Sequence, residues 1–354
     1  MPASYATHRS QLELILRAWG MPEATAISTA EIMSWADLHG IDTHGISMIP
    51  TYDERRRAGR IDMRAQPVVA RETPVSALID GGGGLGHANA RRAMELAIDK
   101  AKTSGIGVAA VRNSAHFGAC GFYALMAVEE GLIGMVTTSA SGIQVAPTFG
   151  AQARLGTDPI AFAAPGKPGE PFLLDMATTT VAAGKIRNKA NENLPTPVGW
   201  LVKADGSPST DPREVSKGGF MTPLGGTPEG SSHKGYGLSA MVNILSSALS
   251  GASMVTDPMH TKRPGTMGIG HFLLALDPGL FRDAADFRAD VVAFADTLRA
   301  TKPADPARPV LVAGDPERRT AALRRQTGIP VGANLLAKVH DIALASGAAW
   351  IMDK

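Results

Sequence analysis

Two histidines beside glycines are the residues of this chain best suited to acid–base chemistry. His44 lies in HGIDTHGISM (39–48) and His116 in NSAHFG (113–118). The ordinary pKa of histidine lies near neutrality, so either side chain can exchange a proton with a reacting carbonyl or alcohol. Each histidine can equally be structural, and the pair can bind a metal with Asp37 or Asp42. Because the chain has neither H-E-x-x-H nor cysteine-based ligand spacing, no metal site is predicted.

A glycine run at residues 80–88 raises a second hypothesis. In DGGGGLGHA, Gly81, Gly83 and Gly86 satisfy G-x-G-x-x-G between an expected strand and an expected helix, which is the context of a dinucleotide-binding turn. The next expected strand ends in Arg112 and supplies no acidic residue for a ribose hydroxyl. We interpret the run as a tight turn, with the Rossmann alternative left open.

A lysine at the start of an expected helix indicates an anion site. Lys234 lies in SSHKGYGL (231–238), where a glycine-rich loop enters an apolar helix, so a cation and free backbone N–H groups come together. The segment lacks P-loop spacing and therefore indicates phosphate contact without nucleotide hydrolysis, or simply a solvated lysine. The arginines of RRRAGR (55–60) are interpreted as a solvated helix end or as a clamp for a carboxylate or phosphate.

The elements that must position these residues form an α/β pattern with helical ends. Helical spacing of apolar residues predicts helices near 12–19 and 25–38, and a strand, a helix and a strand follow at 76–80, 88–102 and 107–111. Short strands alternate with turns over 134–206, a Gly/Pro/Ser loop spans 217–232, and an apolar helix at 236–249 precedes a strand at 271–277. Helices joined by Pro-rich loops are expected from about residue 285.

The composition is that of an ordinary globular protein. The chain has 354 residues, of which 44% are hydrophobic and 19% charged, and its formal net charge is +2. Neither disorder nor a nucleic-acid surface is predicted, and one large α/β unit or two intertwined domains is expected. The single cysteine, Cys120, excludes an internal disulfide, and no apolar run is long enough to span a membrane. We expect a cytoplasmic protein.

Eight ordered segments resemble the malate/L-lactate dehydrogenase family, which also contains L-sulfolactate dehydrogenase, ureidoglycolate dehydrogenase and diketogulonate reductase. The segments run through most of the chain: ADLHGIDTHG (36–45), DGGGGLGHA (80–88), NSAHFGACGFY (113–123), VAPTFGAQARLGTDPIAFAAPG (145–166), LLDMATTTVAAGKI (173–186), GSPSTDP (206–212), HKGYGL (233–238) and GHFLLALDP (270–278). The resemblance implies a dehydrogenase or reductase that uses NAD or NADP and acts on 2-hydroxy and 2-keto acids.

The resemblance also implies an L-sulfolactate dehydrogenase-like fold that is not Rossmann. A mixed-sheet cofactor domain, residues 117–280, would be flanked by a mostly helical substrate domain made from both chain ends, residues 1–116 and 281–354. Members of the family work as homodimers, so a homodimer with a small-molecule substrate is expected. The glycine run is then a turn.

Single residues take roles from the same resemblance. Proton transfer falls on His44 and His116, and Thr43 stands where the family usually has serine. The implied cofactor contacts are Ser141, Asp175, Met176, Ala177, Lys234, Gly235, Gly314, Asp315 and Pro316.

Two departures from the family pattern argue for an unusual substrate. Met48 stands where an arginine commonly grips the substrate carboxylate, so a nearby cation such as Arg55 is the expected substitute. Asp158 stands where asparagine is common and introduces a charge near the expected site. The alternatives are a cyclic-imine carboxylate reductase, a non-catalytic ligand-binding member of the fold, and metal-assisted hydrolysis through His39, Asp42 and His44.

Overall fold

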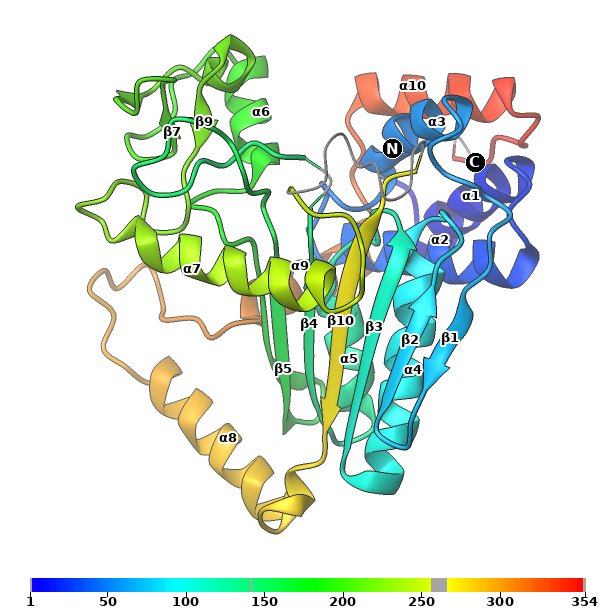
Figure 1. Cartoon of the computed structure of the whole chain (residues 1–354), viewed down its shortest axis with the longest axis vertical. Helices are drawn as coiled ribbons and strands as arrows, with labels where there is room; N and C mark the ends of the chain where they lie inside the picture. The colour runs from blue at the N-terminus through cyan, green and yellow to red at the C-terminus, as the bar shows by residue number, and fades with distance from the viewer. Residues whose placement is uncertain (1, 141, 256–265, 353–354) are drawn as a thin grey trace.

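A seven-stranded mixed sheet forms the centre of the protein in the computed structural model, which describes residues 2–140, 142–255 and 266–352. The strand order is β1-β2-β3-β10-β4-β5-β6 (Figure 1). The β2–β3 pair is parallel, and the other neighbouring pairs are antiparallel. This is not the doubly wound parallel sheet of a Rossmann domain, so the prediction of a mixed, non-Rossmann sheet is confirmed. The strands are β1 (Val68–Glu72), β2 (Ser76–Asp80), β3 (Ile106–Ser114), β4 (Ile133–Thr138), β5 (Ile160–Lys167), β6 (Glu170–Met176) and β10 (Ile269–Leu276).

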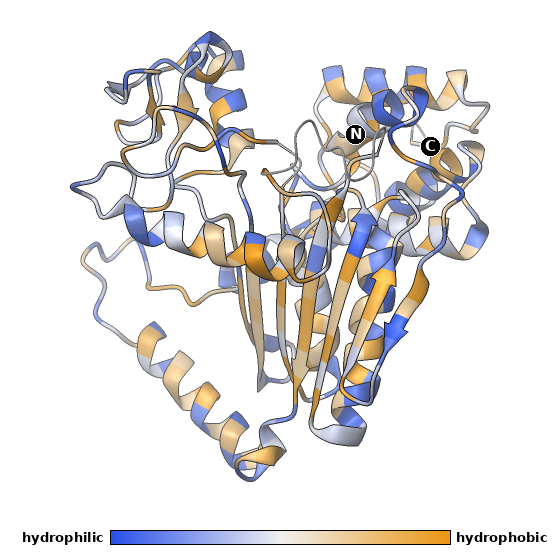
Figure 2. Cartoon of the chain, viewed as in Figure 1, coloured by the Kyte–Doolittle hydropathy of each residue, from blue (hydrophilic) through white to orange (hydrophobic). Residues whose placement is uncertain are grey.

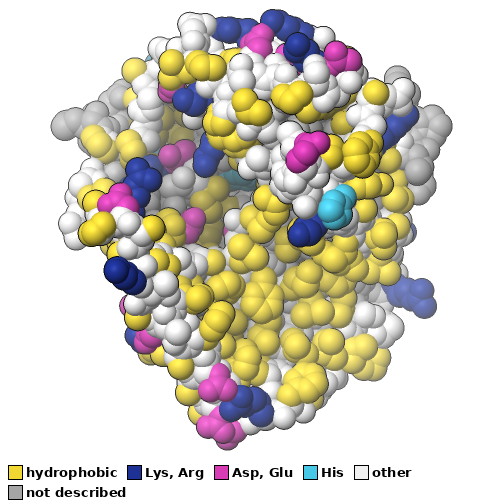
Figure 3. All heavy atoms as spheres, turned by 90° about the vertical axis from the view of Figure 1, so that its left-hand side faces the viewer, with side chains coloured by type: hydrophobic (Ala, Val, Ile, Leu, Met, Phe, Trp, Pro, Cys, Tyr) yellow, Lys and Arg dark blue, Asp and Glu magenta, His cyan; other side chains and the backbone are white. Residues whose placement is uncertain are grey.

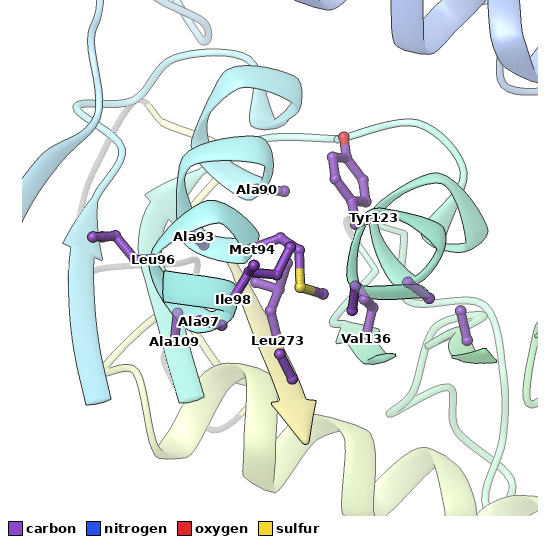
Figure 4. Packing of buried hydrophobic residues seen from close by; sticks show 14 of the residues in the cluster. Ala90, Ala93, Met94, Leu96, Ala97, Ile98, Ala109, Tyr123, Val136 and Leu273 are labelled. Atoms are coloured by element: carbon purple, nitrogen blue, oxygen red, sulfur yellow. The ribbon is translucent and has the colours of Figure 1, made fainter. Parts of the chain in front are cut away.

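Two helices cover one face of this sheet and form the main core with it. They are α4 (Gly86–Ser104), which connects β2 to β3, and α5 (Cys120–Glu129). Figure 4 shows Ala90, Ala93 and Ala97 of α4 close to the strands. A methyl group at Gly107 would lie 1.9 Å from the Ala97 carbonyl oxygen. The small residues therefore let α4 lie directly on the sheet, as a dense core requires.

A helical segment covers the upper part of the opposite face of the sheet. Helix α7 (Ser232–Asn243) and the π-helical turn that continues it (Ile244–Ala248) cross the strands there. Below α7 the strands remain apolar (Figure 2). The predicted helix at 236–249 is confirmed, but it begins at Ser232. Ser231 has a left-handed conformation, which marks the residue before the helix.

A helical layer made from both chain ends lies above one end of the sheet, as predicted. It contains α1 (Tyr5–Ala18), α2 (Glu23–Leu38), α3 (Ile49–Arg57) and α10 (Ala333–Ala345), which share a buried cluster that includes Leu12, Ile15 and Leu16. Gln11 ties the two ends together, because its side chain bonds the backbone of Ala349 and Ile351. Helix α9 (Asp315–Thr327) packs beside α2.

A small lobe and an outer helix complete the fold. The lobe contains α6 (Ala183–Asn191), a 3₁₀ turn (Glu214–Lys217) and the three-stranded sheet β8-β7-β9, whose strands are β7 (Leu201–Val202), β8 (Pro208–Ser209) and β9 (Phe220–Met221). The short strand expected near 199–206 is present, but only Leu201 and Val202 pair there. Helix α8 (Ala284–Arg299) packs on β5.

The expected domain boundary at residue 116 falls within the central sheet. Strand β3 pairs with β10, so the sheet takes three of its strands from the first 116 residues. The division into a substrate side and a cofactor side remains a proposal about function. None of the helices in the described residues is long and apolar enough to span a membrane.

Candidate active site

His44 and His116 meet although 71 residues separate them in the chain. His44 lies in the loop between α2 and α3, and His116 lies in the loop between β3 and α5. Their rings stack with centroids 5.3 Å apart and planes inclined by 27°. Both side chains are only partly exposed. Two partly accessible imidazoles are thus brought together by two separate loops.

The ring of His116 is oriented by Tyr52 of α3. The Tyr52 hydroxyl lies 2.6 Å from His116 Nδ1, and the backbone N–H of Gly118 points at the same nitrogen from 3.4 Å. An N–H can only donate, so Nδ1 is the acceptor and Nε2 carries the ring hydrogen in the neutral form. Tyr52 is fully buried, and burial raises the pKa of its phenol, so it remains a hydroxyl. Sequence reasoning missed Tyr52.

The glycine run holds the His116 loop in place. The N–H of Gly86 donates to the carbonyl oxygen of His116 at 3.0 Å, and a methyl group at Gly86 would lie 2.4 Å from the Ala115 carbonyl oxygen. Gly82 and Gly83 have φ of +62° and +79°, which glycine adopts without strain. The interpretation of the run as a tight turn is confirmed, and the turn serves as the seat of the His116 loop.

A hydrogen bond to the Asp37 carboxylate holds the loop that carries His44. The Asp37 carboxylate accepts a hydrogen bond from Ile46 N–H at 2.7 Å, and His8 Nε2 of α1 lies 3.1 Å from it. A methyl group at Gly45 would lie 2.0 Å from this carboxylate, so glycine is required there. Thr43 Oγ1 lies 2.8 Å from His44 Nδ1. Asp37, which was considered as a metal ligand, is thus occupied in supporting the loop.

Burial keeps the histidines of this region neutral. It lowers the pKa of His44 to about 4 and lowers the pKa of His116 well below its usual value. Two further buried histidines, His87 and His271, each have a pKa lowered to about 3 by burial. His271 bonds Thr138 and Ser114, whereas neither ring nitrogen of His87 has a hydrogen-bond partner in the described structure. Sequence reasoning gave no signal for either residue.

Arg55 and Met48 lie in different surroundings. Met48 packs against the apolar cluster of the helical layer. The Nη1 atom of Arg55 is buried and has no hydrogen-bond partner among the described residues. Its charge also helps to lower the pKa of His116. The guanidinium is therefore near the histidines and retains hydrogen-bonding capacity for a ligand.

The segment of Asp175, Met176 and Ala177 lies at the end of β6. A carboxylate oxygen of Asp175 accepts from Gly121 N–H, at the start of α5, at 2.7 Å. Asp175 has exposed surface, but the protein atoms around it keep much of the water from its carboxylate. This desolvation raises its pKa to about 6. Met176 and Ala177 are half-buried.

Lys234 and Gly235 of α7 lie close to the residues that follow Ala177. Leu224 N–H donates to the carbonyl oxygen of Thr178 at 2.9 Å, and a methyl group at Gly235 would lie 2.3 Å from Leu224 N. Lys234 is exposed. Leu224 therefore lies between Thr178, which follows the Asp175 segment, and the start of α7.

The third predicted cofactor segment lies along β6. Leu173 N–H donates to the carbonyl oxygen of Ala313, and Gly314 has a φ of +94°. The side chain of Asp315 pairs with Arg299 and Arg318, which holds its pKa at about 2. The Asp315 side chain is thus occupied, Gly314 is buried, and Pro316 is exposed. Ser141 lies outside the described residues.

Asp158 has a structural explanation. Its buried carboxylate accepts from Ala140 N–H, Gly156 N–H, the Ser239 hydroxyl and the Asn243 amide, at 2.6–3.0 Å. Four donors compensate one buried charge. The carboxylate therefore ties the loop after β4 to α7.

A hollow opens between the small lobe and the body of the protein, on the face that Figure 3 turns toward the viewer. Basic, acidic and histidine side chains are visible in and around it. The small lobe reaches the His44 loop directly, since a methyl group at Gly184 of α6 would lie 2.5 Å from Thr43 Cγ2. Two histidines and the Arg55 cation thus lie near the point where the small lobe meets the His44 loop.

Comparison with known sequences identifies the family. The profile of malate/L-lactate dehydrogenase matches residues 3–340. The chain belongs to this family. It is 38% identical over 334 residues to a malate dehydrogenase of Pyrococcus horikoshii, which covers 94% of this chain and 92% of that protein. The expected oxidoreductase that acts on CH–OH groups of hydroxy acids, with a nicotinamide cofactor, is thereby confirmed.

Two further family members bear on fold and substrate. The solved structure of sulfolactate dehydrogenase from Methanocaldococcus jannaschii superposes with a TM-score of 0.87 at 34% identity, covering 98% of each chain. The expected L-sulfolactate dehydrogenase-like fold is therefore confirmed. A Delta(1)-pyrroline-2-carboxylate/Delta(1)-piperideine-2-carboxylate reductase of Pseudomonas putida is 33% identical over 273 residues, which cover 77% of this chain and 78% of that protein.

Proposed function

We propose that the protein transfers hydride between NAD or NADP and a 2-hydroxy acid or 2-keto acid, with His44 and His116 handling the proton. The stacked histidine pair carries this proposal, because both rings are neutral and partly accessible. The malate dehydrogenase of Pyrococcus horikoshii supports a dicarboxylate or similar acid as the substrate class.

The described residues fit a bound dinucleotide. Asp175, Met176 and Ala177 would hold the part nearest the histidines, Lys234 and Gly235 a phosphate, and Gly314 to Pro316 the remaining part. Backbone hydrogen bonds of residues adjacent to these segments, and the cation at a helix start, support this assignment, since such a position favours anions. The bound cofactor supplies or accepts the hydride. Ser141 belongs to the same proposed set.

We assign the proton at the reacting oxygen to His116. Two donors at Nδ1 leave the ring hydrogen on Nε2, which is the form that can give a hydrogen to a carbonyl oxygen. When the Nε2 hydrogen passes to the substrate oxygen in reduction, a proton from the medium is taken up at Nδ1 through the Tyr52 hydroxyl and keeps the imidazole neutral; in the oxidative direction both protons move back. His44, stacked on His116 and bonded to Thr43, would orient the substrate or share the proton.

Arg55 is the proposed anchor for the substrate carboxylate. Its buried unpartnered nitrogen and its electrostatic effect on His116 support this role, whereas the Met48 thioether cannot donate a hydrogen bond. Thr43 and Met48 would form the adjoining wall of the substrate site.

A cyclic-imine carboxylate reductase is the second candidate. The Pseudomonas putida relative acts on such compounds by name, and a ring substrate also carries a carboxylate beside the carbon that receives hydride. A non-catalytic binding protein is the third candidate, and the intact histidine pair argues against it.

Residues 1–116 with 281–354 would form the substrate side and residues 117–280 the cofactor side of a cytoplasmic homodimer. A row of half-buried apolar side chains supports a second copy as the partner. Val108, Leu274, Met135, Phe162 and Leu174 are successive register partners across β3, β10, β4, β5 and β6. Figure 3 shows a broad apolar area on the lower part of the molecule.

The deciding experiment is a substrate panel. Purified protein would be assayed with 2-keto acids, 2-hydroxy acids and cyclic imines, with NADH and NADPH in parallel, by the absorbance of reduced nicotinamide. His44→Ala and His116→Ala should lower turnover by on the order of 10²–10⁴ while cofactor binding persists. Parental turnover in both variants would refute the proposed mechanism, and cofactor binding without turnover of any substrate would favour the binding protein.

A further inference from the structure

Arg324 of helix α9 reaches the loop that carries His44. Its guanidinium donates to both carboxylate oxygens of Asp42, with Nη2 and Oδ2 3.0 Å apart, and also to the carbonyl oxygen of Asp37. The Arg324 side chain is only 13% exposed. A bidentate pair fixes orientation as well as distance, so this contact specifies where Asp42 lies.

Asp42 lies at the centre of the turn that presents His44. The Asp42 carbonyl oxygen accepts from the Ser47 hydroxyl at 2.5 Å, which closes the loop across His44. The N–H of His44 donates to Ile41 O at 2.9 Å. A displacement of Asp42 would therefore displace the imidazole two residues later.

Helix α9 also supports the beginning of the same loop. Gly40, with a φ of +81°, has no room for a side chain, because a methyl group there would lie 2.9 Å from Thr320 Cγ2 of α9. The Asp37 carbonyl that Arg324 binds belongs to the last turn of α2. Most exposed ion pairs contribute little, but this one adds a helix-terminal carbonyl and a largely covered arginine to the pair.

We propose that Arg324 is a positioning residue for His44. By binding Asp42 and the end of α2, it holds the His44 loop in the geometry that stacks His44 on His116. Helix α9 is thus part of the active-site machinery, although none of its side chains is among the residues that stack there. The proposal rests on the proposed role of His44 in turnover.

The test compares Arg324→Gln with Arg325→Gln, a matched change at the exposed neighbouring arginine of the same helix. Arg324→Gln should lower kcat roughly 10- to 100-fold, the scale of a misplaced reacting group. Cofactor affinity and the thermal midpoint should stay near those of the parent. Arg325→Gln should behave like the parent, and Arg324→Lys should recover part of kcat by restoring one charged contact.

A double-mutant cycle separates positioning from a general loss of structure. Asp42→Asn should lower kcat as Arg324→Gln does, with no further loss when the two are combined. In a His44→Ala background, Arg324→Gln should leave the residual rate unchanged. The proposal is overturned if kcat in Arg324→Gln stays within twofold of the parent, or falls by the same factor with and without His44. If Arg324→Gln does not fold, Arg324→Lys and Asp42→Asn carry the same comparison. Parental turnover in His44→Ala would instead refute the proposed function.

Discussion

The hydroxyl of Tyr52 lies 2.6 Å from Nδ1 of His116, and this contact orients the imidazole. Tyr52 comes from α3 and His116 from the loop after β3, so the helical layer and the central sheet each supply one partner. The phenol is fully buried and cannot exchange this partner for water. The direction of the His116 ring is therefore set by a residue outside its own loop, while the Gly118 N–H within the loop fixes the tautomer.

Tyr52→Phe should reduce kcat because it removes the donor at Nδ1 while keeping the ring in the core. The loss of one such hydrogen bond corresponds to about 1–3 kcal/mol, or roughly 5- to 150-fold in rate. Steady-state kinetics with the best substrate of the panel would measure it, and cofactor titration should give the parental dissociation constant. An unchanged kcat would mean that Gly118 N–H alone orients His116.

Much of this arrangement could be predicted from sequence, for identifiable reasons. The β2-α4-β3 unit and both helical chain ends have apolar residues at regular spacing, and the motifs around His44 and His116 match a known family. Tyr52 and Arg324 were missed because their roles depend on contacts between segments far apart in the chain, and Asp37 was considered only as a metal ligand. A buried carboxylate that binds a backbone N–H looks like any aspartate in a sequence.

Stability should fall when the pH drops below about 6.5. His87 and His271 have a folded pKa of about 3 and His44 of about 4, against about 6.5 when unfolded, so the unfolded state binds more protons between these values. Their contribution is fully present above pH 6.5 and is lost as the pH falls toward 3. Asp175, with its raised pKa, acts in the opposite direction between about pH 4 and 6.

The contribution of one histidine can be isolated with His87→Gln. Each histidine adds up to about 1.4 kcal/mol per pH unit to the slope of the unfolding free energy. Urea titrations at pH 5, 6 and 7 should therefore show a shallower pH dependence in the variant than in the parent. Equal slopes would mean that His87 binds its proton equally in both states.

Lys234→Ala should weaken cofactor binding without destabilising the fold. Lys234 is exposed at the start of α7, and the variant loses a cation expected to face a phosphate. We expect a loss of about 1–3 kcal/mol, the scale of a charge-assisted hydrogen bond, in fluorescence titrations with reduced cofactor. Gly83→Ala is the contrasting variant, because its φ of +79° predicts lost stability with cofactor affinity retained. If Gly83→Ala lost cofactor affinity and Lys234→Ala kept it, the cofactor would have to bind at the glycine run.

Met135→Glu or Phe162→Glu should convert the proposed homodimer into a monomer. Both residues belong to the half-buried apolar row on the open face of the sheet, and a second copy that covers it would bury the new charge without a partner. Size-exclusion chromatography with light scattering would measure the mass. Val198→Glu is the control, since Val198 is 69% exposed on the small lobe and should not affect assembly. A monomeric parent, or dimeric variants, would place the partner elsewhere.

Arg55→Ala should raise the KM for a 2-keto acid far more than it changes cofactor affinity. The Arg55 guanidinium has a buried nitrogen without a partner among the described residues, and its charge helps to lower the pKa of His116. Losing a charge-assisted contact with a carboxylate costs about 1.5–3 kcal/mol, which is roughly 10- to 150-fold in KM. Arg55→Lys should recover only part of this, because an ammonium cannot form the bidentate pair.

Met48→Arg tests the competing arrangement. Met48 packs against the apolar cluster of the helical layer, so a new guanidinium would have to leave that cluster to reach the substrate. With Arg55 as the anchor, Met48→Arg should change pyruvate reduction little and should not rescue Arg55→Ala. If Met48→Arg strongly increases pyruvate reduction while Arg55→Ala has no effect, Arg55 is not the anchor. The natural substrate should then be sought among ketones that carry no carboxylate at this position.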